Sequence, residues 1–278
     1  MDYLHTPSIL TEHIIEYRGC LLHYWLAGNV DSPMVVMMHG ATMDHRMFNA
    51  QVVALSENYR VLAWDARGHG KSQPGGFDLT LELFTKDMLR ILDQLQVEKF
   101  VAVGQSLGGY VAQHLYMRVP DRVQAMVVIG STPIWKAYSK AEIWALKASL
   151  TLFGLWPYNS LTKLIANRTA IKEPVRQYAL EAARRIPKEQ FMRIWKAVTL
   201  AVNTEGLPSF RFDLPLLLMH GEKDRTGTIK RDMPYWAKEE THAEYHVIPG
   251  AGHNANQDNP EVVNELLHTF LDRSLRYS

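Results

Sequence analysis

The chain has 278 residues, and its 30 Lys and Arg nearly balance 29 Asp and Glu, for a formal net charge of +1. The small net charge and the scattered basic residues argue against a nucleic-acid-binding protein. The length suits one large domain or a domain with an insertion. Cys20 is the only cysteine, which excludes an internal disulfide and a zinc site built from cysteines.

The N-terminal residues and the longest apolar stretch indicate where in the cell the protein is expected. The N-terminal residues lack the basic start and apolar run of a secretory signal. Residues 143–157 form the longest apolar stretch, which contains Lys147 and is shorter than the roughly 20 residues that cross a bilayer. We therefore expect a cytoplasmic protein without stable membrane insertion.

Strand-like and helix-like patterns alternate along most of the chain. Residues 14–27, interrupted at Arg18 and Gly19, predict a hairpin of two strands. Helical periods, such as that of residues 81–95, lie between short apolar runs. These runs, typical of strands buried on both faces of a parallel sheet, occupy residues 34–38, 60–64, 100–103, 125–129, 214–219 and 245–248. The alternation predicts an α/β fold, with a mostly parallel sheet and helices on both of its faces.

The alternation stops over residues 134–212, where the pattern is helical throughout. Helices are predicted at residues 140–153, 160–168, 173–186 and 188–202. We expect residues 1–133 and 213–278 to form the α/β core and residues 134–212 to form a helical cap. A helical insertion between two strands is well placed to cover a site at the carboxyl ends of the strands.

Aromatic and aliphatic side chains are frequent in this insertion. They favour an apolar or aromatic substrate over a sugar or a charged metabolite. Trp135, Trp144, Phe153 and Trp156 are the candidate substrate-binding residues. The competing interpretation for each of them is packing of the insertion onto the core.

The motif that carries chemistry is G-x-S-x-G at residues 104–108, directly after a predicted strand and before a helical pattern. A sharp strand-to-helix turn exposes a serine hydroxyl above the sheet, which makes Ser106 the candidate nucleophile. Gly104 and Gly108 are expected because a side chain at either position would clash with neighbouring backbone. The alternative is an ordinary glycine-rich turn between a strand and a helix.

A serine nucleophile needs a general base, and the base needs a carboxylate that orients it. His253 follows the last predicted strand in a glycine-containing loop that can reach back over the sheet, and it is the candidate base. His39 and His220 each precede a glycine at a strand end and fit roles in organising loops. Asp224 is the candidate acid in preference to Glu222, which lies nearer its strand and has less reach.

Acyl transfer also needs donors that stabilise an oxyanion. The backbone amide of Leu107, directly after the nucleophile, is one candidate donor. The other is expected in the loop after residues 34–38, where we assign the amide of Ala41 and keep Thr42 as the alternative.

These residues resemble the α/β-hydrolase fold family over essentially the whole chain. His39-Gly40 is similar to the oxyanion-loop motif of the family, and residues 65–72 look like its D-x-R-G-x-G-x-S turn, which is chiefly structural there. The resemblance implies eight mostly parallel strands, with the site between core and cap. Ser106 replaces the Asp nucleophile of epoxide hydrolases and haloalkane dehalogenases. The residues after Gly40 lack the H-G-G-P-G pattern of proline iminopeptidases. Within the family, the resemblance therefore leaves esterases, lipases and lactonases as candidate classes.

The combined pattern predicts a serine hydrolase that cleaves a small, apolar carboxylic ester through an acyl-enzyme, without a metal or cofactor. The expected partner is a small-molecule ester and not a nucleic acid. The alternatives are a lactonase or carbon–carbon bond hydrolase with the same triad, and a non-enzymatic ligand receptor on the same fold. The natural substrate and the oligomeric state stay open at this stage.

Overall fold

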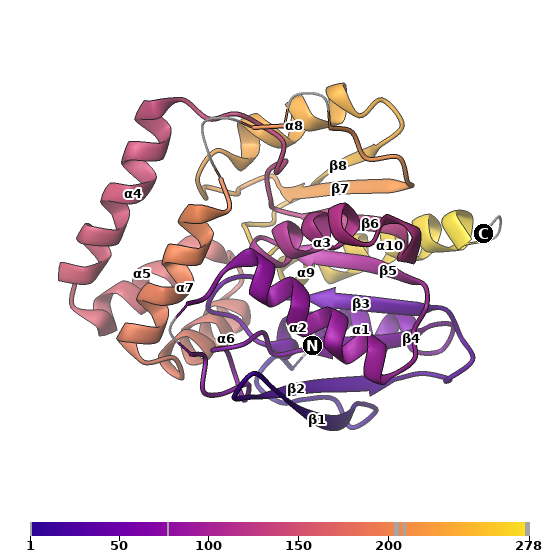
Figure 1. The fold of residues 1–278 in the computed structure, drawn as a ribbon. Helices are drawn as coiled ribbons and strands as arrows, with labels where there is room; N and C mark the ends of the chain where they lie inside the picture. The colour runs from indigo at the N-terminus through magenta and orange to yellow at the C-terminus, as the bar shows by residue number, and fades with distance from the viewer. Residues whose placement is uncertain (1, 77, 203–205, 208–209, 276–278) are drawn as a thin grey trace.

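The computed structural model describes residues 2–76, 78–202, 206–207 and 210–275. The described residues contain one eight-stranded sheet, with strand order β1-β2-β4-β3-β5-β6-β7-β8 (Figure 1). The strands are β1 (Thr11–Tyr17), β2 (Cys20–Ala27), β3 (Met34–Met38), β4 (Arg60–Trp64), β5 (Phe100–Gln105), β6 (Val123–Ile129), β7 (Leu216–Gly221) and β8 (Glu244–Ile248). Only the β1–β2 and β2–β4 pairs are antiparallel, so the predicted mostly parallel sheet is confirmed.

Helices cover both faces of this sheet, as the alternating pattern predicts (Figure 1). Two short 3₁₀ helices, His45–Phe48 and Pro120–Arg122, accompany the α-helices. The α-helices are α1 (Asn49–Leu55), α2 (Leu81–Gln94), α3 (Leu107–Arg118), α4 (Lys140–Leu155), α5 (Tyr158–Thr169), α6 (Glu173–Arg184), α7 (Lys188–Leu200), α8 (Ile229–Glu239), α9 (Ala255–Asp258) and α10 (Pro260–Leu275).

The two faces of β3 show why its residues are apolar without interruption. Met34 and Val36 pack into one hydrophobic core, together with Phe84 of α2. Val35 and Met37 point to the other face and pack into a second core that includes α1 and α10. Because successive side chains alternate between two buried faces, a continuous apolar run is stable only inside such a layered fold.

Four helices, α4 to α7, lie between β6 and β7, where the continuous helical pattern was found. They lie to one side of the sheet in Figure 1, with α4 at the margin of the molecule. The four predicted helices are confirmed, with ends that differ from the predicted ones by at most two residues. Residues 134–139 and 210–212 are not helical, and residues 203–205 and 208–209 lie outside the described residues. The division into core and cap stays a prediction.

The turn at residues 65–72 joins distant parts of the core. Arg67 donates from Nε and Nη2 to the two carboxylate oxygens of Asp87 in α2, at 2.8 and 2.7 Å, and both side chains are buried. Arg67 also donates to the carbonyl oxygen of Tyr17, at 2.8 Å. Ser72 Oγ accepts a hydrogen bond from the amide of His23 in β2 at 2.8 Å. The turn therefore ties α2 to the antiparallel edge of the sheet.

Replacing Arg67 with Ala is expected to lower the free energy of unfolding by about 3–5 kcal/mol, because Asp87 then stays buried without a partner. Urea denaturation measures this change. Lys71→Ala is the matched control, since its ion pair with Glu12 is partly exposed and is worth less than about 1 kcal/mol. Equal losses in the two variants would contradict the structural importance of the buried pair.

Candidate functional site

Ser106 occupies a sharp turn between β5 and α3. It directly follows the last residue of β5 and precedes the first residue of α3, with φ +51° and ψ −112°. Its amide donates to the carbonyl oxygen of Ile129 at the end of β6, at 2.9 Å. A positive φ is costly for a residue with a side chain, and such strain is concentrated at functional sites.

Two glycines allow this turn. A Cβ atom at Gly108 would overlap the carbonyl oxygen of Met38 at the end of β3, and one at Gly104 would overlap the carbonyl oxygen of Gly108. The first turn of α3 therefore packs directly against the strand ends. The sequence-based reason for glycine at both positions matches this geometry.

Gly108→Ala is expected to destabilise the protein by about 1–3 kcal/mol or more, because backbone atoms cannot move as side-chain ends do. Gly154→Ala, in α4, is the matched control: its new Cβ would meet only Met192 Cε at 3.8 Å. Helix propensity predicts that Gly154→Ala is neutral or stabilises by up to about 1 kcal/mol. Thermal unfolding of both variants tests the difference, and equal melting temperatures would contradict it.

His253 and Asp224 form a buried hydrogen-bonded pair. His253 Nδ1 lies 2.9 Å from Asp224 Oδ2, and the amide of Thr226 donates to Asp224 Oδ1 at 2.8 Å. Burial by itself raises the pKa of the Asp224 carboxyl, but the charge and hydrogen bonds of His253 and Thr226 outweigh it and lower the pKa. An ionised Asp224 fixes the proton on Nδ1, which leaves Nε2 as the nitrogen that can exchange a proton.

Glu222, the alternative acid, has a different contact. Its Oε2 accepts a hydrogen bond from the amide of Gly250 at 2.8 Å, on the exposed side of the loop after β8. The structure therefore pairs Asp224, and not Glu222, with His253.

Gln105, which precedes Ser106, connects the serine turn to the histidine loop. Its buried side chain donates from Nε2 to the carbonyl oxygen of His253, at 3.0 Å. On the other side of His253, a Cβ atom at Gly130 would lie only 3.1 Å from His253 Nδ1. Since Gly130 directly follows Ile129, which binds the Ser106 amide, Ser106 and His253 both lie at the carboxyl end of β6.

The histidine loop is also anchored to the insertion, through Asp258. This buried carboxylate accepts hydrogen bonds from the amides of Gly252 at 2.8 Å, Ile171 at 3.0 Å and Lys172 at 2.9 Å. The amide of Asn254 donates to the carbonyl oxygen of Thr169, at 2.8 Å. The segment between α5 and α6 thus supports the position of His253.

The loop after β3 approaches Ser106 closely. A Cβ atom at Gly40 would lie 3.2 Å from Ser106 Cβ, and Met43 donates back to the Gly40 carbonyl oxygen at 3.2 Å to close a turn. Ala41 lies in this turn, next to Thr42, which has φ +68°. In the described part of the chain, neither the Ala41 amide nor the Leu107 amide donates a hydrogen bond within the protein.

His39 organises the same loop. Its Nε2 accepts a hydrogen bond from the Ala66 amide at 2.9 Å, and its Nδ1 lies 2.8 Å from the carbonyl oxygen of Gly40. An acceptor at Nε2 requires the proton on Nδ1, and burial lowers the pKa of the His39 ring, so the ring is neutral. His220 likewise contacts the carbonyl oxygen of Gly221 at 2.9 Å and the hydroxyl of Tyr245 at 2.7 Å.

The structure does not gather the four candidate substrate-binding aromatic residues in one place. Trp135 is buried in the core, and its ring lies 6.1 Å from the ring of Tyr235. Phe153 and the partly buried Trp156 pack against that core from the insertion. Trp144 is 72% exposed on α4. Trp144 therefore faces solvent, while the other three side chains pack within or against the core.

Asp44, His45 and Asp65 form the one group in the described part of the chain that could hold a metal ion. All three are buried and already have protein partners. Asp44 binds the guanidinium of Arg46 at 2.7 Å, and His45 lies 2.8 Å from both Asp65 and Thr6. A cation there would have to displace Arg46, so this group fits a structural cluster.

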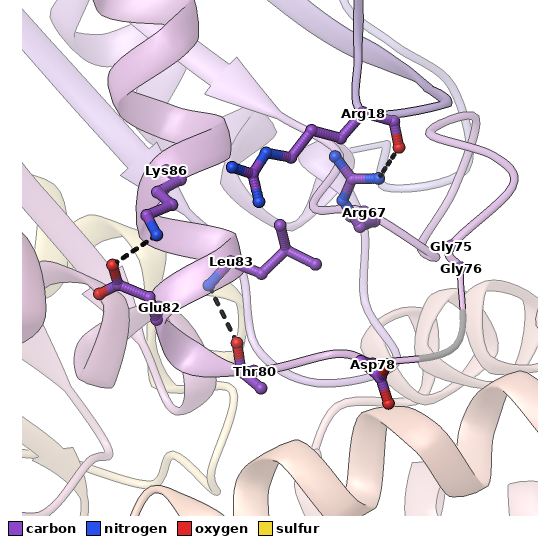
Figure 2. Close-up of a pocket in the computed structure, with 9 residues that line it drawn as sticks. All are labelled: Arg18, Arg67, Gly75, Gly76, Asp78, Thr80, Glu82, Leu83 and Lys86. Carbon is purple, nitrogen blue, oxygen red and sulfur yellow. Dashed lines mark hydrogen bonds and ion pairs between the residues drawn. The ribbon is translucent and has the colours of Figure 1, made fainter.

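The described residues also enclose a cavity of about 400 Å³ (Figure 2). Arg18 and Arg67 line it from one side, and the first turn of α2 lines it from another. None of its lining residues is Ser106, Asp224 or His253. Arg67 is bound to Asp87, and Lys86 is paired with Glu82 at 2.9 Å. The cavity is therefore separate from the candidate site.

Comparison with known proteins agrees with this fold. A family model described as "alpha/beta hydrolase fold" matches residues 33–260. The chain is 27% identical to 3-oxoadipate enol-lactonase 1 of Acinetobacter baylyi, over 93% of this chain and 96% of that protein. It is 26% identical to sn-1-specific diacylglycerol lipase ABHD11 of Mus musculus, over 88% and 83% of the two chains. Among solved structures, a thermophilic esterase from Thermogutta terrifontis has a TM-score of 0.82 at 21% identity, covering 95% of this chain and 99% of that one.

Proposed function

Because the chain belongs to the α/β hydrolase family, we propose that it is a serine hydrolase that cleaves small, apolar carboxylic esters through an acyl-enzyme. One observation carries this proposal: the buried Asp224–His253 pair, linked through Gln105 to the strained turn that presents Ser106. The three side chains follow β5, β7 and β8 of one sheet, in which β6 lies between β5 and β7. This is the arrangement that nucleophile, base and acid require.

In the proposed first step, His253 Nε2 removes the proton of Ser106 as its Oγ attacks the carbonyl carbon of the ester. Asp224 stabilises the imidazolium that forms, since its lowered pKa keeps the carboxylate ionised. His253 then gives the proton to the leaving alcohol as the carbon–oxygen bond breaks. Water, deprotonated by His253, attacks the acyl-enzyme, and His253 returns this proton to Ser106 Oγ as the acyl bond breaks and the acid is released. These steps require no metal or cofactor.

We assign the oxyanion hole to the amides of Leu107 and Ala41. Leu107 is the first residue of α3, so its N–H has no acceptor within the helix, and the positive end of the helix dipole lies beside it. Ala41 belongs to the turn that packs on Ser106. Removal of one such donor typically costs about 3 kcal/mol of transition-state stabilisation.

We assign to α4–α7 the role of a cap over this site. The amides of Ile171 and Lys172 donate to Asp258, and the Asn254 amide donates to the Thr169 carbonyl oxygen, which connects the insertion to the histidine loop. The partly buried aromatic side chains Phe153 and Trp156 supply apolar surface within the insertion. These features support an apolar substrate.

Lactone hydrolysis is a second candidate with a specific observation behind it. The enol-lactonase of Acinetobacter baylyi is similar over 93% of this chain. A lactone is a cyclic ester, and the same attack by Ser106 would open the ring, with the leaving alcohol held on the same molecule. The similarity to a diacylglycerol lipase instead supports an acyclic ester.

Labelling with an alkyl fluorophosphonate tests the proposed nucleophile. The phosphonyl group is expected to attach to Ser106 with loss of fluoride, giving one modified peptide in mass spectrometry. His253→Ala is expected to react at least 100-fold more slowly, because the base no longer activates the serine. Unmodified Ser106 after prolonged exposure would contradict the proposal. Hydrolysis rates on matched acyclic esters and lactones then separate the two substrate classes.

A further inference from the structure

The outer face of α4 is apolar and exposed. It consists of Ala141, Trp144, Ala145, Ala148, Thr151, Leu152 and Leu155, which recur at helical spacing. Trp144 is 72% exposed, Leu152 is 52% exposed and Leu155 is 81% exposed. Figure 1 shows α4 at the margin of the molecule, away from the sheet. Several large apolar side chains exposed on one helix face are a feature of interaction surfaces.

The opposite face of α4 already has its partner, so the helix is held with its outer face toward solvent. The ring of Phe153 lies 5.2 Å from the ring of Trp195 in α7, and Trp195 Nε1 donates to Ser149 Oγ at 2.8 Å. At the start of α4, Glu142 accepts from Ser139 and pairs with Arg231 of α8 at 2.7 Å. These contacts fix the rotation of α4.

The insertion that contains α4 carries an excess of positive charge. Residues 134–202 contain twelve Lys and Arg against four Glu, a net +8, so the rest of the chain carries the remaining 18 Lys and Arg against 25 Asp and Glu, a net −7. Lys140 and Lys147 are exposed beside the outer face of α4. Glu142 is the one acidic residue of α4, and it is neutralised by Arg231.

An apolar helix face flanked by lysines, on a positive part of the molecule, is complementary to a surface of anionic phospholipids. Trp is favoured at the headgroup level, and Lys extends its ammonium group toward phosphate while its methylene chain stays in apolar surroundings. Two copies related by a twofold axis through this face would instead bring two positive surfaces together. Among the described residues, none of the helices could span a bilayer.

We propose that the outer face of α4 binds the surface of membranes that contain anionic phospholipids. Trp144, Leu152 and Leu155 enter the interface, and Lys140 and Lys147 contact the phosphates. This accounts for the exposed position of Trp144, which the sequence suggested as a substrate contact. The proposal is independent of the chemistry at Ser106.

Sedimentation with vesicles of phosphatidylcholine alone, or of phosphatidylcholine with 30% phosphatidylglycerol, tests it. The protein is expected to sediment with the anionic vesicles at low salt and to be released at high salt. The Leu152→Ser/Leu155→Ser and Lys140→Glu/Lys147→Glu variants are each expected to bind at least tenfold more weakly. The Ile14→Ser/Val30→Ser variant is the matched control, because these exposed apolar residues lie outside the insertion. It is expected to bind like the wild type.

Circular dichroism and thermal unfolding establish that each variant is folded, and light scattering gives the oligomeric state of the protein. Failure to bind anionic vesicles, equal binding to neutral vesicles, or equal loss in the control would overturn the proposal. A dimer that only the Leu152→Ser/Leu155→Ser variant dissociates would assign the face to a second copy of the chain and would also overturn it.

Discussion

Ser106→Ala is expected to lower kcat/KM on a short p-nitrophenyl ester by at least about 1000-fold, while the fold is retained. Alanine lacks the Oγ atom that forms the covalent bond with the substrate. The turn itself is held by the Ser106 backbone amide, which alanine keeps. Residual turnover is expected, because the oxyanion donors and substrate binding still act in the variant. Steady-state kinetics on wild type and variant measure the loss.

Ser56→Ala is the control for this experiment, since Ser56 follows α1 and lies outside the candidate site. It is expected to keep wild-type kinetics. If Ser106→Ala hydrolysed the ester as fast as Ser56→Ala, another residue would have to be the nucleophile. The roles assigned to Asp224 and His253 would then also be wrong.

Asp224→Asn is expected to reduce kcat by about 1000- to 10,000-fold, because an amide stabilises the wrong tautomer of His253 and cannot balance the imidazolium charge. Glu222→Gln is the matched control, since Glu222 binds the Gly250 amide and not His253. It is expected to retain nearly full activity. The reverse ranking of the two variants would assign the acid to Glu222.

Asp224→Asn is also expected to change how the free energy of unfolding depends on pH in the acidic range. Folding lowers the pKa of Asp224 below its usual value of 3.8, so the carboxylate stabilises the folded state above that pH. This contribution is lost as the pH falls from 3.8 through the lower pKa of the folded state. The free energy of unfolding should therefore fall less steeply over this interval in Asp224→Asn than in the wild type. Urea denaturation at several pH values measures both slopes, and identical slopes would contradict the coupling.

The parts of the fold that the sequence predicts are those where local pattern and burial agree. β3 and β4 begin and end at the expected residues, because both faces of these strands are buried and every buried side chain in them must be apolar. β7 begins two residues later than expected, after Pro215, whose nitrogen cannot donate to the sheet, and continues to Gly221. The pairing of His253 with Asp224 could be predicted because both follow strands at one edge of the sheet.

The side-chain support of the site could not be predicted in the same way. Gln105 and Asp258 act through backbone groups of residues that are distant in the sequence, such as His253 and Lys172. A polar side chain that binds a remote backbone group leaves no periodic signal. For the aromatic residues of the insertion, composition alone does not say whether a side chain such as Trp144 points inward or toward solvent.

Stopped-flow hydrolysis of a p-nitrophenyl ester tests the central claim most directly, because it observes the acyl-enzyme as it forms. If acylation is made faster than deacylation by choosing an activated leaving group, the wild type should release a burst of about one p-nitrophenol per active site before slower turnover. Ser106→Ala should give no burst. A burst of equal size in Ser106→Ala, or wild-type hydrolysis without labelling of Ser106 under burst conditions, would contradict an acyl-enzyme on Ser106.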